Sequence, residues 1–347
     1  MMMKPQYARR TKLKVKYEGA DISKDLEKYL ISLTYTDNEE DESDDLQIAL
    51  EDKEGNWARD WLMQTGGKGA KIEASIIQVD EDRSEKELKC GKFKADTINE
   101  SGPPTKVTIK ASAIPTDSKI TAEKKTKAWE NIKLSAIASD IAGKNKLKSE
   151  FESEEDPLYD RREQTKKSDL EFLKELCKDA GISLKVTDKK IVLFDASKFE
   201  KLPAIDTIER GQSNVTRWTF GTNFQEAGYS KCEVTYTDPK TKKTIKGEFE
   251  NPKKDKSTGR VLKINTKVKD KAEADKLAKK KLREKNKTET QASLEVTGNI
   301  NYVAGVNLKI KGWGIYDGKY IIQSANHSIS NSGYKVSLSL RKVLEGY

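Results

Sequence analysis

The stretch that decides the fold is written twice, as GKFKADTINESGPPTKVTIKASA at residues 91–113 and GKYIIQSANHSISNSGYKVSLSL at residues 318–340. Each copy opens with Gly-Lys-aromatic, then reaches Ser-Gly, and continues to Lys-Val-x-Leu/Ile. An alternating strand follows a glycine upstream of each copy, GAKIEASI in the first and GVNLKIKG in the second. The shared order predicts an internal duplication of one β-barrel. The predicted equivalent positions are Gly91 with Gly318, Phe93 with Tyr320, Val107 with Val336 and Ile109 with Leu338.

Physical constraints make these positions informative. Alternation places Phe93 and Tyr320 on a defined strand face, because a slip of one residue would turn each aromatic side chain to the other face. The glycine two residues before each aromatic suits a tight turn or a bulge, where a side chain would clash. We therefore expect both stretches to occupy equivalent places in two similar barrels.

The composition describes an ionic chain without membrane or disulfide signals. Hydrophobic and charged residues each make up 35% of the 347 residues, enough for packed cores in two or three domains. No apolar run could span a bilayer and no secretory signal precedes the chain, so we expect folding in a cytosol. The net charge is +9, but lysines interleave with acids, which favours a solvated face over a nucleic-acid site. Cys90, Cys177 and Cys232 lie far apart and are predicted to be buried small hydrophobes.

Hydrophobic periodicity divides the chain into three domains. Residues 1–115 alternate with a period of two, as in Leu13, Val15 and Tyr17, and predict a first antiparallel β-barrel. Residues 116–205 predict a small α+β domain. Residues 206–347 predict a second barrel with an inserted helix at about 268–288. The expected fold class is α+β, mainly β.

Three helices are predicted from spacing and capping residues. The first covers Thr121–Ala142, and the polar residues after it read as a loop with one extended piece. The second begins at Ser168, which forms a capping box with Glu171, and ends before Gly181. Its predicted apolar stripe is Leu170, Leu173, Leu176, Cys177 and Ala180. The third helix, Asp270–Asn286, is the insertion in the second barrel.

The residue types that carry enzyme chemistry are scarce. The single histidine, His327, would have to serve any nucleophile alone, and the first repeat has no histidine near the matching position. No Walker A, G-x-G-x-x-G or H-E-x-x-H motif is present. The acidic clusters 39–45 and 152–156 read as solvated loops, whereas a catalytic acid needs partial burial. We predict no catalytic residue, no cofactor and no metal.

Five stretches resemble, in order, the late control D or baseplate hub proteins of contractile phage tails and phage-tail-like bacteriocins, of the Gram-positive type. The resemblance covers essentially the whole chain, and the ordered set is more specific than any single motif. The stretches are DISKDLEKYLISLTYTDNEEDESDDLQIALEDKEGNW, KELKCGKFKADTINESGPPTKVTIKASAIP, KAWENIKLSAIASDIAG, SDLEFLKELCKDAGISLKV and YDGKYIIQSANHSISNSGYKVSLSLRKV.

The resemblance implies a structural role rather than an enzymatic one. Such proteins form homotrimers with two related barrels per chain, so that three chains present six barrels to a six-fold tail tube and hold a trimeric spike on the other face. The tape measure and baseplate wedge proteins are further implied partners, and neither a membrane nor a specific nucleic acid is implied. The resemblance places the protein on the tail axis of a particle assembled in the bacterial cytoplasm. Because the chain ends soon after its last predicted strand, we expect the spike to be a separate protein and expect no wall-degrading extension.

Two other functions remain open from the sequence. A tail-tip peptidoglycan hydrolase needs only two carboxylates, and acids are abundant; an assay on purified cell walls distinguishes it from a hub. A β-barrel could also bind single-stranded nucleic acid on a basic, aromatic surface, which salt-dependent binding would reveal.

Overall fold

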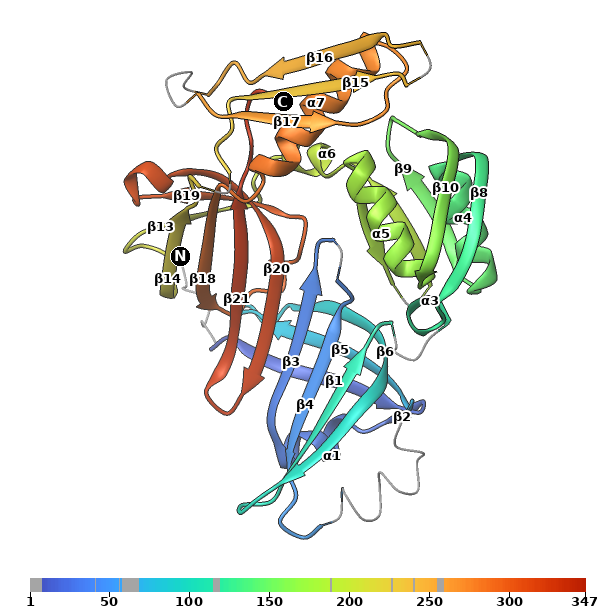
Figure 1. Cartoon of the computed structure of the whole chain (residues 1–347). Helices are drawn as coiled ribbons and strands as arrows, with labels where there is room; N and C mark the ends of the chain where they lie inside the picture. The colour runs from blue at the N-terminus through green and yellow to red at the C-terminus, as the bar shows by residue number, and fades with distance from the viewer. Residues whose placement is uncertain are drawn as a thin grey trace.

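The computed structural model describes residues 8–40, 42–55, 57, 69–114, 119–187, 189–225, 227–239, 241–254 and 259–347. Figure 1 shows four parts, each built around its own hydrophobic cluster. We call them the first unit (residues 10–112), the middle part (119–201), the second unit (206–222 with 290–342) and the insertion (231–286). The predicted boundary at residue 115 lies outside the described residues.

The first unit is an antiparallel sheet with strands in the order β3-β4-β7-β6-β5-β1-β2. Alternating residues of these strands fill its core, as the period of two predicts. Its elements are β1 (Arg10–Tyr17), β2 (Ala20–Asp21), α1 (Ser23–Tyr29), β3 (Leu30–Asn38), β4 (Asp45–Glu51), β5 (Lys71–Val79), β6 (Glu85–Ser101) and β7 (Lys106–Ser112).

The second unit repeats the order of the first five strands but differs beyond them. Its strands follow the order β14-β18-β21-β20, and β19 pairs with β20. The last strand differs, because β13 joins β19 in parallel whereas β1 joins β5 antiparallel. Its elements are β13 (Asp206–Glu209), β14 (Val215–Thr222), β18 (Thr290–Thr297), β19 (Asn307–Lys311), η3 (Gly314–Tyr316), β20 (Gly318–Ser330) and β21 (Gly333–Lys342).

The two units share one continuous sheet. Strand β3 pairs antiparallel with the C-terminal half of β20, which joins both units into a 13-stranded sheet. In Figure 1, β3 and β20 lie side by side between the two units. The chain is therefore mainly β with a large antiparallel sheet, as predicted from the alternation.

The insertion between β14 and β18 is larger than the single helix that the sequence predicts. It adds a three-stranded sheet of its own, against which α7 packs. Helix α7 packs closely on this sheet at Gly247, where an added Cβ would lie 2.4 Å from the Cβ of Ala274. Alternation around Cys232 and Val234 shows that these strands bury one face, but cannot show which sheet they join. The elements are β15 (Lys231–Thr237), β16 (Thr244–Glu250), β17 (Val261–Asn265) and α7 (Lys271–Asn286).

The middle part departs from the first predicted helix. Residues that the spacing assigns to Thr121–Ala142 split into α3, a strand and α4. The strand, β8, pairs with β10 in a two-stranded ribbon whose mostly exposed polar residues carry no strand-like alternation. A second sheet has the order β11-β12-β9. The elements are α3 (Lys119–Ala122), β8 (Lys125–Lys133), α4 (Leu134–Lys144), β9 (Lys148–Glu152), β10 (Leu158–Lys167), α5 (Asp169–Ala180), β11 (Ser183–Val186), β12 (Lys190–Phe194) and α6 (Ala196–Lys201).

Helix α5 forms as its sequence predicts. The Ser168 hydroxyl accepts a hydrogen bond from the Glu171 backbone N–H, and the Glu171 carboxylate accepts one from the Ser168 N–H. Gly181 ends the helix with a φ of 65°, a conformation that glycine adopts without steric cost. Leu173 and Leu176 are buried against α4 and the nearby strands, together with Phe172, which the predicted stripe omitted.

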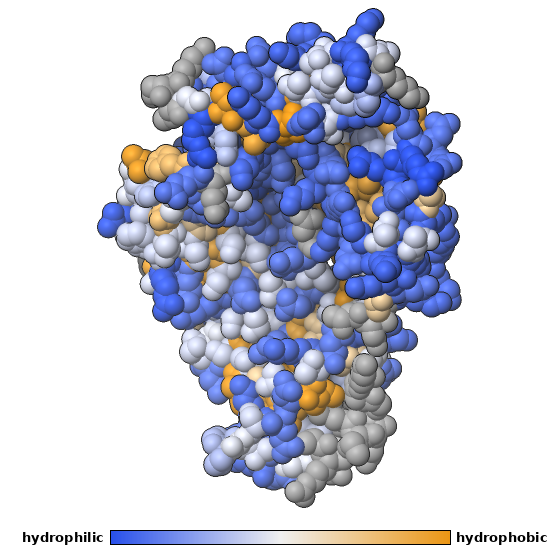
Figure 2. Space-filling model, viewed as in Figure 1, coloured by the Kyte–Doolittle hydropathy of each residue, from blue (hydrophilic) through white to orange (hydrophobic). Residues whose placement is uncertain are grey.

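The surface is densely ionic. Figure 2 shows a mostly hydrophilic face on which hydrophobic residues gather only in small patches. Among the described helices, none has the length and apolar character needed to cross a bilayer.

We predict that α5 anchors the middle part. Leu173→Ala should lower the free energy of unfolding by about 2–5 kcal/mol, because it opens a cavity in a fully buried site. Ser168→Ala should cost about 1 kcal/mol through loss of the cap. Urea denaturation measures both, and the exposed Lys178→Ala on the same helix is the control. Unchanged midpoints for both core and cap variants would show that the helix contributes no packing energy.

Candidate assembly interface

The joint between the two units is a ladder of paired residues. Ser324 lies opposite Asn38, and the register continues without a break to Ser330 opposite Ser32. On the core face, Leu33 meets Ile329, and Ile329 is part of the first unit's hydrophobic cluster. The joint therefore combines backbone hydrogen bonds with a shared apolar core.

His327 lies inside this joint. Its imidazole stacks between Tyr35, at 5.8 Å between ring centroids, and Tyr334, at 6.0 Å. Nδ1 shares a hydrogen bond of 2.7 Å with the Tyr334 hydroxyl. Burial lowers the pKa of His327 to about 4, so the ring is neutral at physiological pH. Its position and contacts are those of a packed core residue.

A buried charge cluster ties four parts of the chain together. Arg341 of β21 is fully buried and pairs with Glu200 of α6 and, at 3.3 Å, with Glu39 after β3. Arg283 of α7 reaches Glu200 at 2.6 Å. Burial acts to raise the pKa of Glu200, but Arg341 and Arg283 outweigh it and the net pKa is lowered. For Glu39 burial outweighs Arg341, and its pKa is raised.

The prediction that cluster 39–45 is a solvated loop is wrong for its inner residues. Glu39 is only 4% exposed. Lys185 of the middle part lies 3.4 Å from Asp44 and 2.8 Å from Asp37, which precedes the cluster. Burial raises the pKa of Asp44 to about 6 even beside this lysine. The sequence shows the acids but not their partners, which lie some 150 to 300 residues further along the chain.

The second acidic cluster, residues 152–156, makes structural hydrogen bonds and ion pairs. Asp156 accepts hydrogen bonds from the Ser135 backbone N–H at 3.0 Å and from its hydroxyl at 2.6 Å, at the start of α4. Glu155 pairs with Lys280 of the insertion. Cys90, Cys177 and Cys232 form no disulfide and are buried, as predicted.

The predicted repeat landmarks all lie in the core-forming strands of the two units. Gly91 and Gly318 have φ values of 114° and 143°, a region that favours glycine. The six apolar landmarks are all at most 2% exposed: Phe93, Val107, Ile109, Tyr320, Val336 and Leu338.

The two long hairpins pair in matching register. Counted from the aromatic landmark, a bulge falls after the second residue in both, between Ala95 and Thr97 and between Ile322 and Ser324. Seven residues after Phe93, Glu100 lies opposite Val107. Seven residues after Tyr320, His327 lies opposite Val336.

The strands beyond the hairpins match in the same way. Ile109 faces Ile48 of β4, as Leu338 faces Leu294 of β18. The next strands, β3 and β14, each carry a bulge five residues before an aromatic: Leu30 precedes Tyr35, and Val215 precedes Phe220.

Two sheet edges have no strand beside them in the described structure. Strand β14 pairs only with β18, and residues 97–101 of β6 pair only with β7. Trp218 on β14 is 46% exposed, with Trp313 at 6.2 Å and the Arg210 guanidinium at 5.2 Å from its ring. Unpaired edges with exposed aromatic rings are typical of association surfaces.

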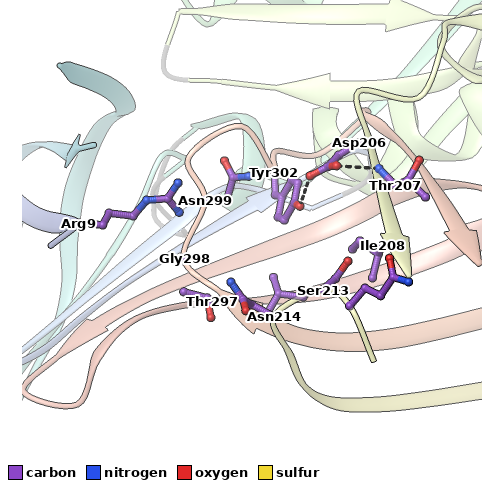
Figure 3. A pocket seen from close by; sticks show the side chains of 12 residues that line it. Arg9, Asp206, Thr207, Ile208, Ser213, Asn214, Thr297, Gly298, Asn299 and Tyr302 are labelled. Atoms are coloured by element: carbon purple, nitrogen blue, oxygen red, sulfur yellow. Dashed lines mark hydrogen bonds between the residues drawn. The ribbon is translucent and has the colours of Figure 1, made fainter. Parts of the chain in front are cut away.

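A polar pocket of about 230 Å³ lies near the start of β14 (Figure 3). The Asp206 carboxylate accepts hydrogen bonds from the Tyr302 hydroxyl at 2.6 Å and from the Thr207 backbone N–H at 2.7 Å. Arg9 lines the opposite side. The pocket holds no pair of nucleophile and base, and no cluster of metal-ligating side chains is found among the described residues. Among these features, the sheet edges stand out as a candidate functional site.

We predict that Arg341→Ala destabilises the protein by about 3–5 kcal/mol, because it leaves the Glu39 carboxylate without this buried partner and Glu200 with Arg283 alone. Chemical denaturation measures the loss. The double variant with Glu39→Gln should recover part of it, since a neutral amide costs less to bury and the pair of Glu200 with Arg283 is kept. If the double variant is no more stable than the single one, the cost does not come from the unpaired Glu39 charge.

We predict that His327 makes the protein less stable as the pH falls from 6.5 to 4. The unfolded state takes up a proton near pH 6.5, while the folded state resists protonation down to about pH 4. The loss should approach about 3 kcal/mol at the low end of this range. Thermal unfolding of wild type and His327→Gln across the range isolates the effect, because this is the only histidine. A difference between the two proteins that does not change with pH would contradict it.

Comparison with solved structures supports the fold. The 43 kDa tail protein of prophage MuSo2 from Shewanella oneidensis superposes with a TM-score of 0.71 at 16% identity, covering 96% of this chain and 98% of that one. The Escherichia coli c3393 protein, a type VI secretion component, superposes with a TM-score of 0.58 at 11% identity, covering 92% of this chain and 75% of that one.

Sequence comparison identifies the family. A probable baseplate hub protein of Escherichia phage P2 is 24% identical over 230 residues, which is 64% of this chain and 56% of the phage protein. The match thus spans just over half of that relative's length. The family model of the phage tail baseplate hub matches residues 103–333, about two thirds of the chain. The chain belongs to the phage tail baseplate hub family.

Proposed function

We propose that three copies of this chain form the hub of a contractile tail, and that the hub joins a six-fold tail tube to a trimeric spike. In this proposal the first and second units are copies of one barrel, so three chains present six similar units. The hub acts by assembly, not by catalysis. It assembles in the bacterial cytoplasm and stays on the tail axis of the particle.

The observation that carries the proposal is the matched construction of the two units. Five strands follow the same spatial order, β3-β4-β7-β6-β5 and β14-β18-β21-β20-β19, and the bulges fall at corresponding positions. Two copies per chain are what a three-fold assembly needs to offer six nearly equivalent contacts to six identical tube subunits.

The parts without a second copy suit the three-fold side. The middle part and the insertion each occur once, so in a trimer they would appear three times around the axis. They contact each other where Lys280 of α7 donates to the Ala180 carbonyl at 3.2 Å. In this proposal they surround the ring and leave the tube-facing side to the repeated units.

The two faces of the sheet differ in polarity, as expected for a sheet that lines a water-filled channel on one side. At the joint, Leu33, Tyr35 and Ile329 point to the core, while Thr34 and Ser328 on the alternate face are only partly buried. Small hydroxyl side chains keep such a face hydrated. We propose that this face lines the channel.

The relatives give supporting context. The Escherichia coli type VI protein is described as structurally similar to the T4 bacteriophage tail proteins gp27 and gp5. His327 is buried and neutral, so it offers no accessible acid or base to a substrate.

We predict that the purified chain forms a trimer of about 117 kDa, three times its 39.1 kDa mass, and that this trimer binds the tube protein encoded with it. Light scattering measures the mass, and electron microscopy of the mixture should place the trimer at one end of the tubes. The Arg341→Ala variant, which loses the buried ion pairs that link the units, should bind tubes poorly. A chain that stays monomeric at high concentration, with and without tube protein, would refute the proposal.

A further inference from the structure

We infer that β14 of one chain pairs with residues 97–101 of β6 in the next chain, in the register that β3 and β20 use within one chain. The inference rests on the proposed trimer and identifies the surface that closes it. Every chain would then contain one such joint internally and share two more with its neighbours.

The correspondence of strands sets the partners. Strand β14 occupies in the second unit the place of β3 in the first, and β6 occupies the place of β20. Within the chain, β3 of the first unit joins β20 of the second. The same contact, moved one unit along a ring, joins β14 of the second unit to β6 of a first unit. This first unit belongs to another chain. Within one chain, the first and second units already contact each other through β3 and β20.

The bulges fix the register. From Leu30 to Tyr35 and from Val215 to Phe220 the bulged segments have the same length, so Thr34 corresponds to Thr219 and Thr36 to Gly221. On the other strand, Ser328 corresponds to Ser101, since each lies eight residues after its aromatic landmark. Because Ser328 lies opposite Thr34, we infer that Ser101 lies opposite Thr219 of the neighbouring chain.

Both strand edges are accessible to a second chain. Thr219 and Ser101 are exposed, and among the described residues neither segment has another strand on that side. A strand edge of this kind offers a row of N–H and C=O groups that a second strand can pair. The partner is therefore a second copy of this chain.

The side chains at the edge complement one another in size. Within the chain, Leu33 is fully buried because Ile329 lies opposite it. The corresponding residue on β14 is Trp218, which is 46% exposed in the single chain. The residue corresponding to Ile329 is Gly102, just past the end of β6. A large indole opposite a glycine replaces two medium side chains, so the neighbour can cover Trp218 without a clash.

Cysteine cross-linking tests the register. The double variant Ser101→Cys with Thr219→Cys should form disulfides between chains on mild oxidation, giving linked dimers and trimers on a non-reducing denaturing gel. The native cysteines are all buried, and each single variant should stay unlinked. The matched control, Asn99→Cys with Thr219→Cys, shifts one position by two residues. It should link at least about five-fold more slowly, because diagonal strand neighbours are too far apart for an unstrained disulfide.

A second variant tests the energetic role of Trp218. Trp218→Ser should raise the concentration at which the trimer dissociates at least about ten-fold, since it removes a large aromatic side chain from the contact. Leu158→Ser is the control, because Leu158 is 44% exposed, much as Trp218 is, but lies on β10 of the middle part. Equal dissociation of the two variants would overturn the role of Trp218 in the contact.

The outcomes separate the inference from the proposed function. A trimer that forms under reducing conditions but never links Ser101 to Thr219 overturns the inferred pairing and leaves the hub proposal intact. Equal linking of the double variant and its control overturns the register. Absence of any trimer refutes the hub proposal and the inference with it.

Discussion

The pairing of β3 with β20 is the contact on which the rest of the structure depends. Each strand is an edge of its own unit, and an edge leaves a row of backbone donors and acceptors that must find partners. By pairing with each other, the two units satisfy these groups, and Ile329 of the second unit joins the core of the first unit beside Leu33. The merged sheet sets the relative position of the units, while β14 and residues 97–101 of β6 each keep one side without a strand among the described residues.

The buried charges around Arg341 make this position specific. Hydrophobic contact alone tolerates sliding, whereas a guanidinium needs its carboxylates at defined places. Arg341 takes one partner, Glu39, from the end of β3 and another, Glu200, from α6, and Glu200 also holds Arg283 of α7. Ion pairs of this kind add little net stability compared with apolar packing, but a misplaced partner leaves a buried charge unpaired. The cluster therefore disfavours alternative arrangements of the four parts more than it strengthens the native one.

Local sequence signals predicted the local elements well. The capping box at Ser168 and the cap at Asp270 mark the starts of α5 and α7 where the structure has them. The failures have a common physical cause. The ribbon strand β8 buries too little for its alternation to show, and the hydrophobic pattern cannot distinguish the sheet of the insertion from the sheet of the second unit. In the sequence, Glu39 is one acid in an acidic run. Its buried partner, Arg341, lies 302 residues further along the chain, so local patterns do not reveal the pair.

A ring of duplicated units needs two kinds of joint that do not exchange partners. Within the chain, Tyr35 lies opposite His327. At the corresponding place between chains, Phe220 would lie opposite Glu100. The tyrosine and histidine rings stack in a closed, apolar site, where a glutamate would be buried without a partner. An exposed rim between chains tolerates that glutamate, since water still reaches it. The exchange of His327 for Glu100 disfavours pairing of β3 with the β6 strand of another chain. It therefore favours alternation of first and second units around the ring. In the proposed ring, divergence of the two units is thus as necessary as their similarity.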